Sequence, residues 1–497
     1  MIALLSLTAQ ADPGPILSAI EADHSGVVLI TQGDERRHVV GHGRTAPGDP
    51  EPPDPDTLLW VGSISKQFAA AAALSLVDAG TLSLDQPVTS IFPELPASAL
   101  SLEGEECTVA RLLRATCGIP RQLGAPSAFL DISTDTAVQA RFLDELATAP
   151  LLFAPGSDHL YSNIGYDLAG LLVERVAQAP LETVLAPLLQ RAGMTSTGTD
   201  PDALDDFDDR IAWGQFTLLG PAWSGRWLRL GPRKPTTIGA AGNVFSTAAD
   251  MARWTAALHH GALLSAASLA AMTTPSHDDY AMGLVVDGEA GARFIWHNGT
   301  LSPHGYSAAV GWQEETDTTI VVLNNQVHGL DATDLMFELE RALRGKAFEP
   351  ERLEVSQQDR VMASLMGANY ALLGPLLLLG SLLMTAQRPK TGRLPWLAGV
   401  LALNSGGVFA LTVFSPLLPS VLGLLVLAMA TGMVIGLRRH AARPLLAPKS
   451  KRRDILNTTI LLIMALGFAL VPVSSTQTVW FTSVLAIIAG IELWRAR

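Results

Sequence analysis

The front part of the chain, residues 12–350, mixes short apolar runs with polar turns. Runs rich in apolar and β-branched residues at 26–31 and 38–42 flank a polar turn and predict a two-stranded hairpin. Similar runs at 307–311 and 319–324 predict two more strands near the other end of this part. We expect strands from the two ends to pair in one sheet.

Helical patterns precede, separate and follow these strands. The expected helices cover residues 16–21, 69–79, 108–114, 167–177 and 333–343. The run 69–79 is mostly Ala and Leu, which favour a helix, and Gly80 lies where a glycine cap would end it. The pattern predicts an α+β fold: an antiparallel sheet flanked by helices that cover one face, with a helical subdomain inserted between the strands.

Three long uncharged runs make up most of the back part, residues 361–497. The run 361–387 has 27 residues, enough for one helix across the roughly 30 Å hydrocarbon layer of a bilayer. The runs 394–437 and 455–491 are each interrupted by proline or polar residues and predict two helical hairpins. The back part is therefore predicted to be an all-α transmembrane domain of five helices surrounded by membrane lipid.

Lysine and arginine fall on alternate sides of these expected helices. They follow the first, third and fifth, at Arg388, Lys390, Arg393, Arg438, Arg439, Arg443, Lys449, Lys451, Arg452, Arg453, Arg495 and Arg497. Because basic loops stay in the cytoplasm, this distribution places the C-terminus there and residues 12–350 outside. No ionisable residue lies within an expected helix, so an anchor is favoured over a transport or partner-binding role.

The first eleven residues have the composition of the end of a secretory signal peptide. An apolar run leads to Ala9-Gln10-Ala11, which has the pattern of a cleavage site, but the usual basic segment is missing. Either the true start lies upstream, which we favour, or this is a short apolar terminus without a targeting role. The expected domains are a signal remnant (1–11), a front domain (12–350), a linker (351–360) and a membrane domain (361–497).

Charge and composition exclude several functional classes. Of the net charge of −13, residues 361–497 contribute +10, which leaves −23 for residues 1–360. So acidic a front part argues against nucleic acid as a partner. No His, Cys, Asp or Glu residues have metal-ligand spacing, so no metal or other cofactor is implied. Cys107 and Cys117 are expected to be unpaired thiols because a helix lies between them.

Ser63 and Lys66 stand at the start of the Ala- and Leu-rich helix and form a candidate catalytic pair. Positions i and i+3 of a helix share a face, so the hydroxyl and the amine would point the same way. A serine becomes a nucleophile when a base takes its proton, and lysine can be that base when burial and the helix N-terminus disfavour its ammonium form. The alternative is a helix-capping serine with a surface lysine, since so short a pattern recurs by chance.

Two further stretches carry polar groups suited to catalysis. Tyr161 and Asn163 precede an apolar helix and offer a phenol for proton transfer and an amide for substrate binding. The sequence His297-Asn298-Gly299-Thr300 ends an apolar strand. Taken alone, the tyrosine fits a surface turn better, and Asn298-Gly299-Thr300 also matches a glycosylation sequon.

Together the three stretches resemble the serine β-lactamase and DD-peptidase superfamily, and specifically its class C-like branch of penicillin-binding DD-peptidases, D-aminopeptidases and esterases. Ser63-x-x-Lys66, Tyr161-Ser162-Asn163 and His297-Asn298-Gly299 occur in the family's order within residues 26–344. Residues 188–195 and 240–250 are also similar to this family. The resemblance implies a β-lactamase/transpeptidase-like fold.

The resemblance also implies a role for each residue. Ser63 would attack a carbonyl to form an acyl-enzyme, while Lys66 and Tyr161 share its proton and later deliver it to the leaving group. The implied substrate-binding residues are Asn163, His297, Asn298, Gly299 and Thr300. The backbone N–H groups of Ser63 and Thr300 would form the oxyanion hole, and Gly299 would leave room for the acyl group.

Two stretches depart from the family pattern. Ala115-Thr116-Cys117-Gly118 stands where relatives often have His-Thr-Ser-Gly, which changes the packing but none of the proposed catalytic groups. His297 stands where β-lactamases usually have lysine, so a group with a pKa near about 6.5 replaces a permanent cation. This favours a peptidase or esterase over an efficient β-lactamase.

We therefore expect a membrane-anchored, extracytoplasmic serine hydrolase that cleaves amide or ester bonds of small-molecule or peptide substrates, D-amino acid peptides among them. One alternative is a catalytically weak penicillin-binding sensor that signals through the membrane helices. Another is a lipid or solute carrier with a vestigial front domain. The basic cluster Arg226, Arg229, Arg233 and Lys234 is either a carboxylate-binding loop or, as we favour, a solvated turn. Nothing in the sequence specifies an oligomeric state.

Overall fold

The computed structural model describes residues 13–20, 24–46, 49, 51–121, 136–200, 204, 206–216, 239–301, 304–327, 330–348 and 353. The chain divides into two units after Arg360, and every described residue belongs to the first. The expected signal remnant, the five membrane helices and the basic cluster at 226–234 lie outside the described residues. Within the described ranges, no helix combines the length and the apolar character needed to cross a bilayer.

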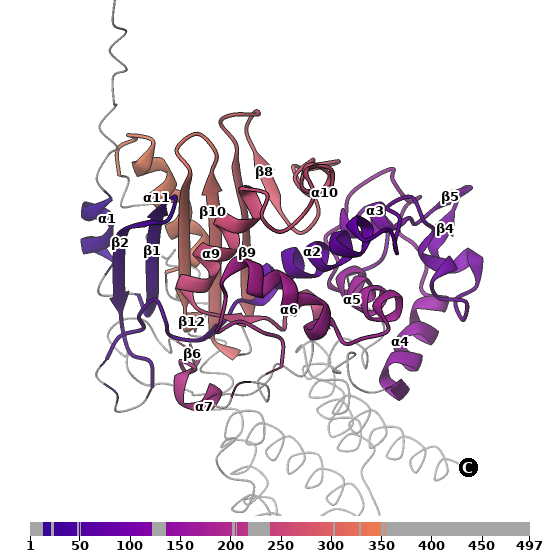
Figure 1. Ribbon diagram of the computed structural model, residues 1–497, viewed down its shortest axis with the longest axis horizontal. Helices are drawn as coiled ribbons and strands as arrows, with labels where there is room; N and C mark the ends of the chain where they lie inside the picture. The colour runs from indigo at the N-terminus through magenta and orange to yellow at the C-terminus, as the bar shows by residue number, and fades with distance from the viewer. Residues whose placement is uncertain are drawn as a thin grey trace, which may run out of the picture. The chain divides into compact units, whose positions relative to one another are not determined.

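A six-stranded antiparallel sheet organises the described part (Figure 1). Its strands are β1 (Gly26–Gln32), β2 (Glu35–His42), β8 (Val285–Asp287), β9 (Phe294–Leu301), β10 (Tyr306–Gln313) and β11 (Thr318–Asn324). The strand order is β2-β1-β11-β10-β9-β8, so the N-terminal hairpin pairs with strands from the other end of the domain. The predicted hairpin, the two predicted C-terminal strands and their pairing are confirmed.

Helices and short elements complete the domain. The helices are α1 (Gly14–Ala19), α2 (Ser65–Asp78), α3 (Val109–Leu113), α4 (Thr136–Thr148), α5 (Asn163–Ala177), α6 (Leu181–Ala192), α7 (Phe207–Arg210), α8 (Gly239–Gly242), α9 (Ala248–His259), α10 (Ala266–Met272) and α11 (Ala332–Leu343). The short strands and 3₁₀ turns are β3 (Leu59–Trp60), β4 (Ser101–Leu102), β5 (Glu105–Glu106), β6 (Gln215–Phe216), β7 (Phe245–Ser246), β12 (Gln326–Val327), η1 (Gly62–Ile64), η2 (Val88–Ser90) and η3 (Ala97–Leu100). In Figure 1, α2 to α5 gather beside the β8 and β9 side of the sheet as the predicted helical subdomain.

Helices cover both faces of the sheet. Along β1, Val28 and Ile30 belong to one apolar core and Val27 and Leu29 to the other, because successive side chains of a strand point to opposite faces. Helices α1 and α11 contribute to the first core, and α9 packs on the second face. The expectation of helices on one face alone is therefore wrong. The uninterrupted apolar run of β1 requires cover on both sides.

Helix α2 is the buried centre of the helical subdomain. It is predicted at 69–79 and observed at Ser65–Asp78, after the 3₁₀ turn η1, and Gly80 follows with a φ of +72°. Its alanines are fully buried, and their small side chains allow neighbouring helices to approach closely. The same close packing recurs nearby, where a Cβ atom added to Gly170 of α5 would overlap Ala240 of α8.

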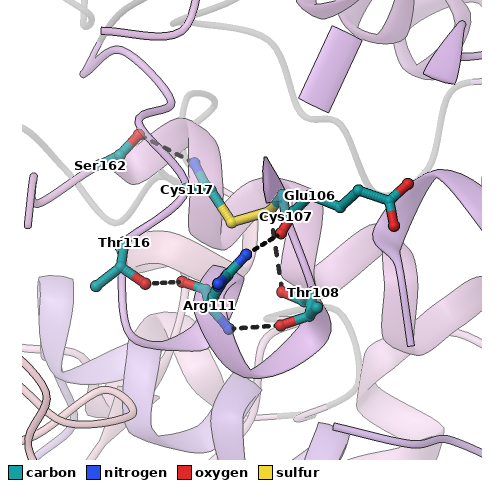
Figure 2. Close-up of a disulfide and its surroundings, with 8 residues drawn as sticks. Glu106, Cys107, Thr108, Arg111, Thr116, Cys117 and Ser162 are labelled. Carbon is teal, nitrogen blue, oxygen red and sulfur yellow. Dashed lines mark hydrogen bonds between the residues drawn. A yellow bond between two sulfur atoms is a disulfide. The ribbon is translucent and has the colours of Figure 1, made fainter. Parts of the chain in front are cut away.

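Cys107 and Cys117 form a disulfide, so the prediction of two unpaired thiols is wrong (Figure 2). Helix α3 does lie between them, but its five residues span only about 7.5 Å. After this helix, Ala115 adopts a left-handed conformation with a φ of +56°, and the chain turns back. The two Cα atoms consequently lie 5.1 Å apart, within the range that a disulfide bridges.

Candidate active site

Ser63 lies in the turn η1 and Lys66 in the first turn of α2. The Ser63 side chain is partly exposed, whereas Lys66 is fully buried. Lys66 Nζ is 3.1 Å from Ser63 Oγ, which confirms that the two side chains point the same way. The alternative of a surface lysine is therefore excluded.

Three oxygen atoms surround the Lys66 amine. Besides Ser63 Oγ, Nζ donates to Asn163 Oδ1 and to the carbonyl oxygen of Ala241, both at 2.8 Å. As an ammonium, Lys66 donates to all three oxygens. As a neutral amine, it donates to the two carbonyl oxygens and turns its lone pair to the Ser63 hydroxyl, which can itself donate. The same arrangement therefore holds Lys66 in both protonation states, as a base that accepts and returns a proton requires.

Ala241 is a functional residue that the sequence did not reveal. Its carbonyl oxygen holds Lys66, while its N–H donates to Asp167 Oδ1 in α5 at 3.3 Å. A backbone carbonyl has no side-chain signature, although the stretch 240–250 did carry part of the family resemblance. Asn163 likewise positions the lysine amine, in addition to the substrate-binding role predicted for its amide.

Tyr161 also contacts the Lys66 amine. Lys66 Nζ lies over the Tyr161 ring, 4.7 Å from its centroid, so a segment far away in sequence packs against the lysine. The next residue, Ser162, caps α5 by accepting a hydrogen bond from Gly165 N. The structure thus brings the three predicted catalytic side chains, Ser63, Lys66 and Tyr161, into one site.

Tyr280 completes an aromatic wall around this site and was missed by the sequence reasoning. It is 3% exposed, meets the Tyr161 ring edge-on at 5.9 Å and stacks on His159 at 5.0 Å. The loop that carries Tyr280 packs closely on α2 at Gly283, where an added Cβ atom would lie 2.7 Å from the Lys66 backbone. A tyrosine in a loop with no motif around it gives no signal in a single sequence.

Two buried tyrosines near the site keep their protons. Burial raises the pKa of the Tyr280 phenol well above its ordinary value, and burial likewise raises the pKa of Tyr166, whose ring is 5.6 Å from Lys66 Nζ. No group of three or more His, Cys, Asp or Glu side chains in the described part of the chain is placed to share a metal ion.

Strand β9 brings the third motif against the nucleophile turn. A Cβ atom at Gly299 would lie 2.7 Å from Ser63 N and would overlap the carbonyl oxygen of Val61. In the reverse direction, a Cβ atom at Gly62 would lie 3.0 Å from Thr300 N. The backbone N–H groups of Ser63 and Thr300 thus lie on two segments in close contact, as an oxyanion hole requires. This backbone contact is itself a reason for glycine at position 299.

His297 is buried beside the site, where its ring lies 6.2 Å from the Tyr161 ring and 6.1 Å from the Tyr280 ring. It is 2% exposed, and its Nδ1–H donates to the carbonyl oxygen of Asn298. Burial, together with the nearby Lys66, lowers the pKa of His297 to about 3. The ring is therefore neutral at physiological pH, and its Nε2 is a buried acceptor for which the described residues supply no partner.

Asn298 is placed away from the nucleophile. Its side-chain amide donates to Thr333 Oγ1 of α11 at 3.0 Å, and Trp296 packs on Phe337 of the same helix. Because side chains alternate along a strand, Asn298 belongs to the sheet face opposite Gly299. This corrects the assignment of the Asn298 side chain to substrate binding. The same alternation places the Thr300 side chain on the α11 face, so only its backbone N–H faces the Ser63 turn.

Comparison with known proteins assigns the domain to a family. Residues 17–343 match the model of the Beta-lactamase family, which is more than half of the chain. The chain belongs to this family. The assignment agrees with the order of the three motifs and with the antiparallel sheet and helical subdomain on which they are placed.

Named members of the family differ in activity. Esterase EstB of Burkholderia gladioli is 38% identical over 152 residues, which cover 29% of this chain and 38% of the esterase. The D-alanyl-D-alanine-carboxypeptidase/endopeptidase AmpH of Escherichia coli (strain K12) is 26% identical over 231 residues, covering 46% of this chain and 56% of AmpH. The crystal structure of a penicillin binding protein from Bacillus halodurans is 27% identical, with a TM-score of 0.54, and covers 65% of this chain and 98% of its own.

These matches are partial on both sides. The chain spans between 38% and 56% of the length of the two named relatives. The fold follows from the family match over residues 17–343, whereas the substrate does not follow from relatives that match only in part.

Proposed function

We propose that this chain is a serine hydrolase that cleaves ester or amide bonds through an acyl-enzyme on Ser63. The observation that carries the proposal is the 3.1 Å distance from Lys66 Nζ to the Ser63 hydroxyl oxygen, with the centroid of the Tyr161 ring 4.7 Å from the same amine. A nucleophile, a proton acceptor and a second proton-transfer group thus meet at one partly exposed serine.

The steps follow from these positions. Ser63 Oγ bonds to the substrate carbonyl carbon while its proton passes to the Lys66–Tyr161 pair, and the N–H groups of Ser63 and Thr300 stabilise the oxyanion. The pair then protonates the leaving alcohol or amine as its bond to the carbonyl breaks. Water, activated by the same pair, hydrolyses the acyl ester and frees Ser63.

The neutral character of the site favours substrates without a charged group at the third motif. His297 is uncharged and buried, so it does not supply the cation that a lysine would place there. The named relatives include an esterase and a D-alanyl-D-alanine-carboxypeptidase. We therefore assign the chain to esters and to amides such as those of D-amino acid peptides, with β-lactams as poor substrates.

Purified full-length protein tests this function directly. We expect a fluorophosphonate probe to label the protein, and p-nitrophenyl esters or D-amino acid peptides whose C-terminal carboxyl is blocked as an amide to be hydrolysed faster than nitrocefin. The Ser63→Ala variant should lose labelling and turnover, and Lys66→Met should lower kcat by about 10²-fold or more. Turnover that survives Ser63→Ala refutes the proposal, and so does the absence of any Ser63-dependent labelling. Acylation of Ser63 by penicillin without turnover would favour the sensor instead.

We further propose that the domain is exported and held at the membrane by the five predicted C-terminal helices. The alternate placement of Lys and Arg supports this topology, and the disulfide supports an oxidising compartment, where such bonds persist. Fusion of alkaline phosphatase after residue 350 should give an active reporter, and a fluorescent protein after residue 497 should fold in the cytoplasm. Inactive phosphatase fusions that are stably made would contradict this topology.

A further inference from the structure

The Cys107–Cys117 disulfide joins two segments with different surroundings (Figure 2). On one side, Cys107 belongs to the packed core. Its N–H donates to Leu100 O at 2.8 Å, and its carbonyl oxygen accepts from Val88 N at 2.9 Å. Val88 and Leu100 are themselves buried, so this end of the bridge is fixed.

On the other side, Cys117 lies in the segment 115–120, which supports the catalytic phenol. The N–H of Leu160 donates to Ala115 O at 3.0 Å, and Ser162 Oγ donates to Pro120 O at 2.9 Å. The residues directly before and after Tyr161 are therefore both hydrogen-bonded to the segment that the disulfide anchors.

Further backbone contacts extend this support. Gly156 N donates to Thr116 O at 2.7 Å, and Leu152 N donates to Gly118 O at 2.8 Å. A Cβ atom at Gly118 would overlap the carbonyl oxygen of Phe153, so the two segments touch without room for a side chain. A shift of the segment 115–120 would consequently also shift the stretch 152–162.

The supporting segment holds a conformation that its own backbone does not favour. Ala115 has left-handed dihedrals with a φ of +56°, whereas Gly118, with a φ of +72°, adopts them without strain. A residue with a Cβ atom in this region costs about 1 kcal/mol or more, so the surrounding structure has to maintain it. The disulfide lies between these two positions and restrains both.

We propose that the Cys107–Cys117 disulfide is a positioning device for Tyr161, which sets the place of the phenol relative to the Ser63–Lys66 pair. The two cysteines are positioning residues and touch neither substrate nor reacting atoms. The inference rests on the proposed function, because it assigns the bridge a role in proton transfer rather than in folding alone.

A double-mutant cycle on the full-length protein tests the inference. The bridge is removed by Cys107→Ala with Cys117→Ala, in the wild-type background and in Tyr161→Phe. In the wild-type background we expect kcat and the rate of fluorophosphonate labelling both to fall about 10- to 100-fold with KM nearly unchanged, because a displaced catalytic group costs rate rather than binding. In the Tyr161→Phe background we expect removal of the bridge to change the rate of fluorophosphonate labelling less than about twofold.

Two controls separate positioning from lost stability. Cys107→Val with Cys117→Ala restores apolar volume without the bridge and should show the same fall in kcat, even where the double alanine variant folds poorly. Leu339→Ala in α11 creates a cavity in the core on the opposite sheet face, and should lower the unfolding temperature while leaving kcat unchanged.

Each outcome bears on one proposal. Additive losses in the two backgrounds, or an unchanged kcat without the bridge, overturn the positioning role while leaving the hydrolase intact. A fall in kcat after Leu339→Ala that matches the fall without the bridge also overturns it, because stability alone would then explain the effect. Turnover that survives Ser63→Ala overturns the proposed function itself.

Discussion

Gly299 of β9 packs so closely against the turn η1, which carries Ser63, that no side chain fits at position 299. A methyl group there would lie 2.7 Å from Ser63 N and would overlap the carbonyl oxygen of Val61, so β9 or the turn η1 has to move. Either movement separates the N–H groups of Ser63 and Thr300. We expect Gly299→Ala to lower the rate of Ser63 acylation about 10²-fold or more, measured by fluorophosphonate labelling.

Gly165 offers a matched control for this substitution. It lies in α5, its added Cβ atom would meet neighbours only at 3.6 Å or beyond, and its φ is not positive. Gly165→Ala should therefore keep near-normal labelling and raise stability by up to about 1 kcal/mol, the helix preference of alanine over glycine. Equal losses in Gly299→Ala and Gly165→Ala would show that the backbone contact has no special role.

His297 provides a second prediction at the scale of one residue. Burial lowers its pKa to about 3, so it stays neutral from pH 5 to pH 8 and adds no ionisation to catalysis in that range. His297→Gln, which keeps a neutral polar side chain, should leave the shape of the kcat/KM–pH profile between pH 5 and 8 unchanged even if its height falls. A step near pH 6.5 that the variant removes would show that His297 titrates during turnover.

The site residues that could be predicted from the sequence are those with reactive side chains in a recognisable motif. Ser63, Lys66 and Tyr161 carry such chemistry, and the structure brings them together. Ala241 and Tyr280 were missed for a physical reason. One acts through a backbone carbonyl and the other through a ring contact from a distant loop, and both contacts arise only on folding.

Helix α2 carries Lys66 in its first turn, and the helix is closely surrounded by buried residues. Ala71 is fully buried in the apolar core that surrounds this helix. Ala71→Leu forces extra methyl groups into that space and should lower the free energy of unfolding by about 1–3 kcal/mol, measured by urea titration. The exposed Ala79, at the end of the same helix, should accept leucine with a change within about 0.5 kcal/mol. Similar effects at both positions would contradict the packing argument.

Among the secondary-structure elements, those that are marked by a run of buried apolar residues were predicted correctly from the sequence. The apolar run of β1 and its turn to β2 produced the predicted hairpin. Ends fixed by polar contacts were read less well: α5 was predicted to begin at residue 167 but begins at Asn163, because Ser162 caps it. The disulfide was missed because the sequence does not show that the chain reverses after α3.

Three histidines of the described domain have strongly lowered pKa values and lie at separate places, two of them buried and His259 half-buried. They are His24 beside Asn324, His259 stacked on Trp312, and His297 in β9. Burial lowers the pKa of His24 to about 4 and the pKa values of His259 and His297 to about 3. The sequence singled out His297 through its motif, but it did not show that any of the three is neutral in the fold, because the lowered pKa values follow from tertiary packing.

These histidines make the folded state sensitive to mild acid. Below pH about 6.5 the unfolded chain binds a proton at each of them, whereas the folded chain binds none until pH falls towards 4. The unfolded state thus binds more protons in this window, so stability is fully present above pH about 6.5 and is lost as pH falls. From pH 7 to pH 5 we expect each histidine to remove about 2 kcal/mol from the free energy of unfolding, measured by thermal or urea unfolding.

His259 is the position that tests this linkage without touching the candidate site. Its ring stacks on Trp312 at a centroid distance of 4.2 Å, on the second sheet face. Replacing it with glutamine, which does not titrate, should lower stability at pH 7 through lost stacking and should make the decline from pH 7 to pH 5 shallower by about 2 kcal/mol. A decline as steep as that of the wild type would mean that acid sensitivity arises from other groups, and activity at pH 7 should be retained in either case.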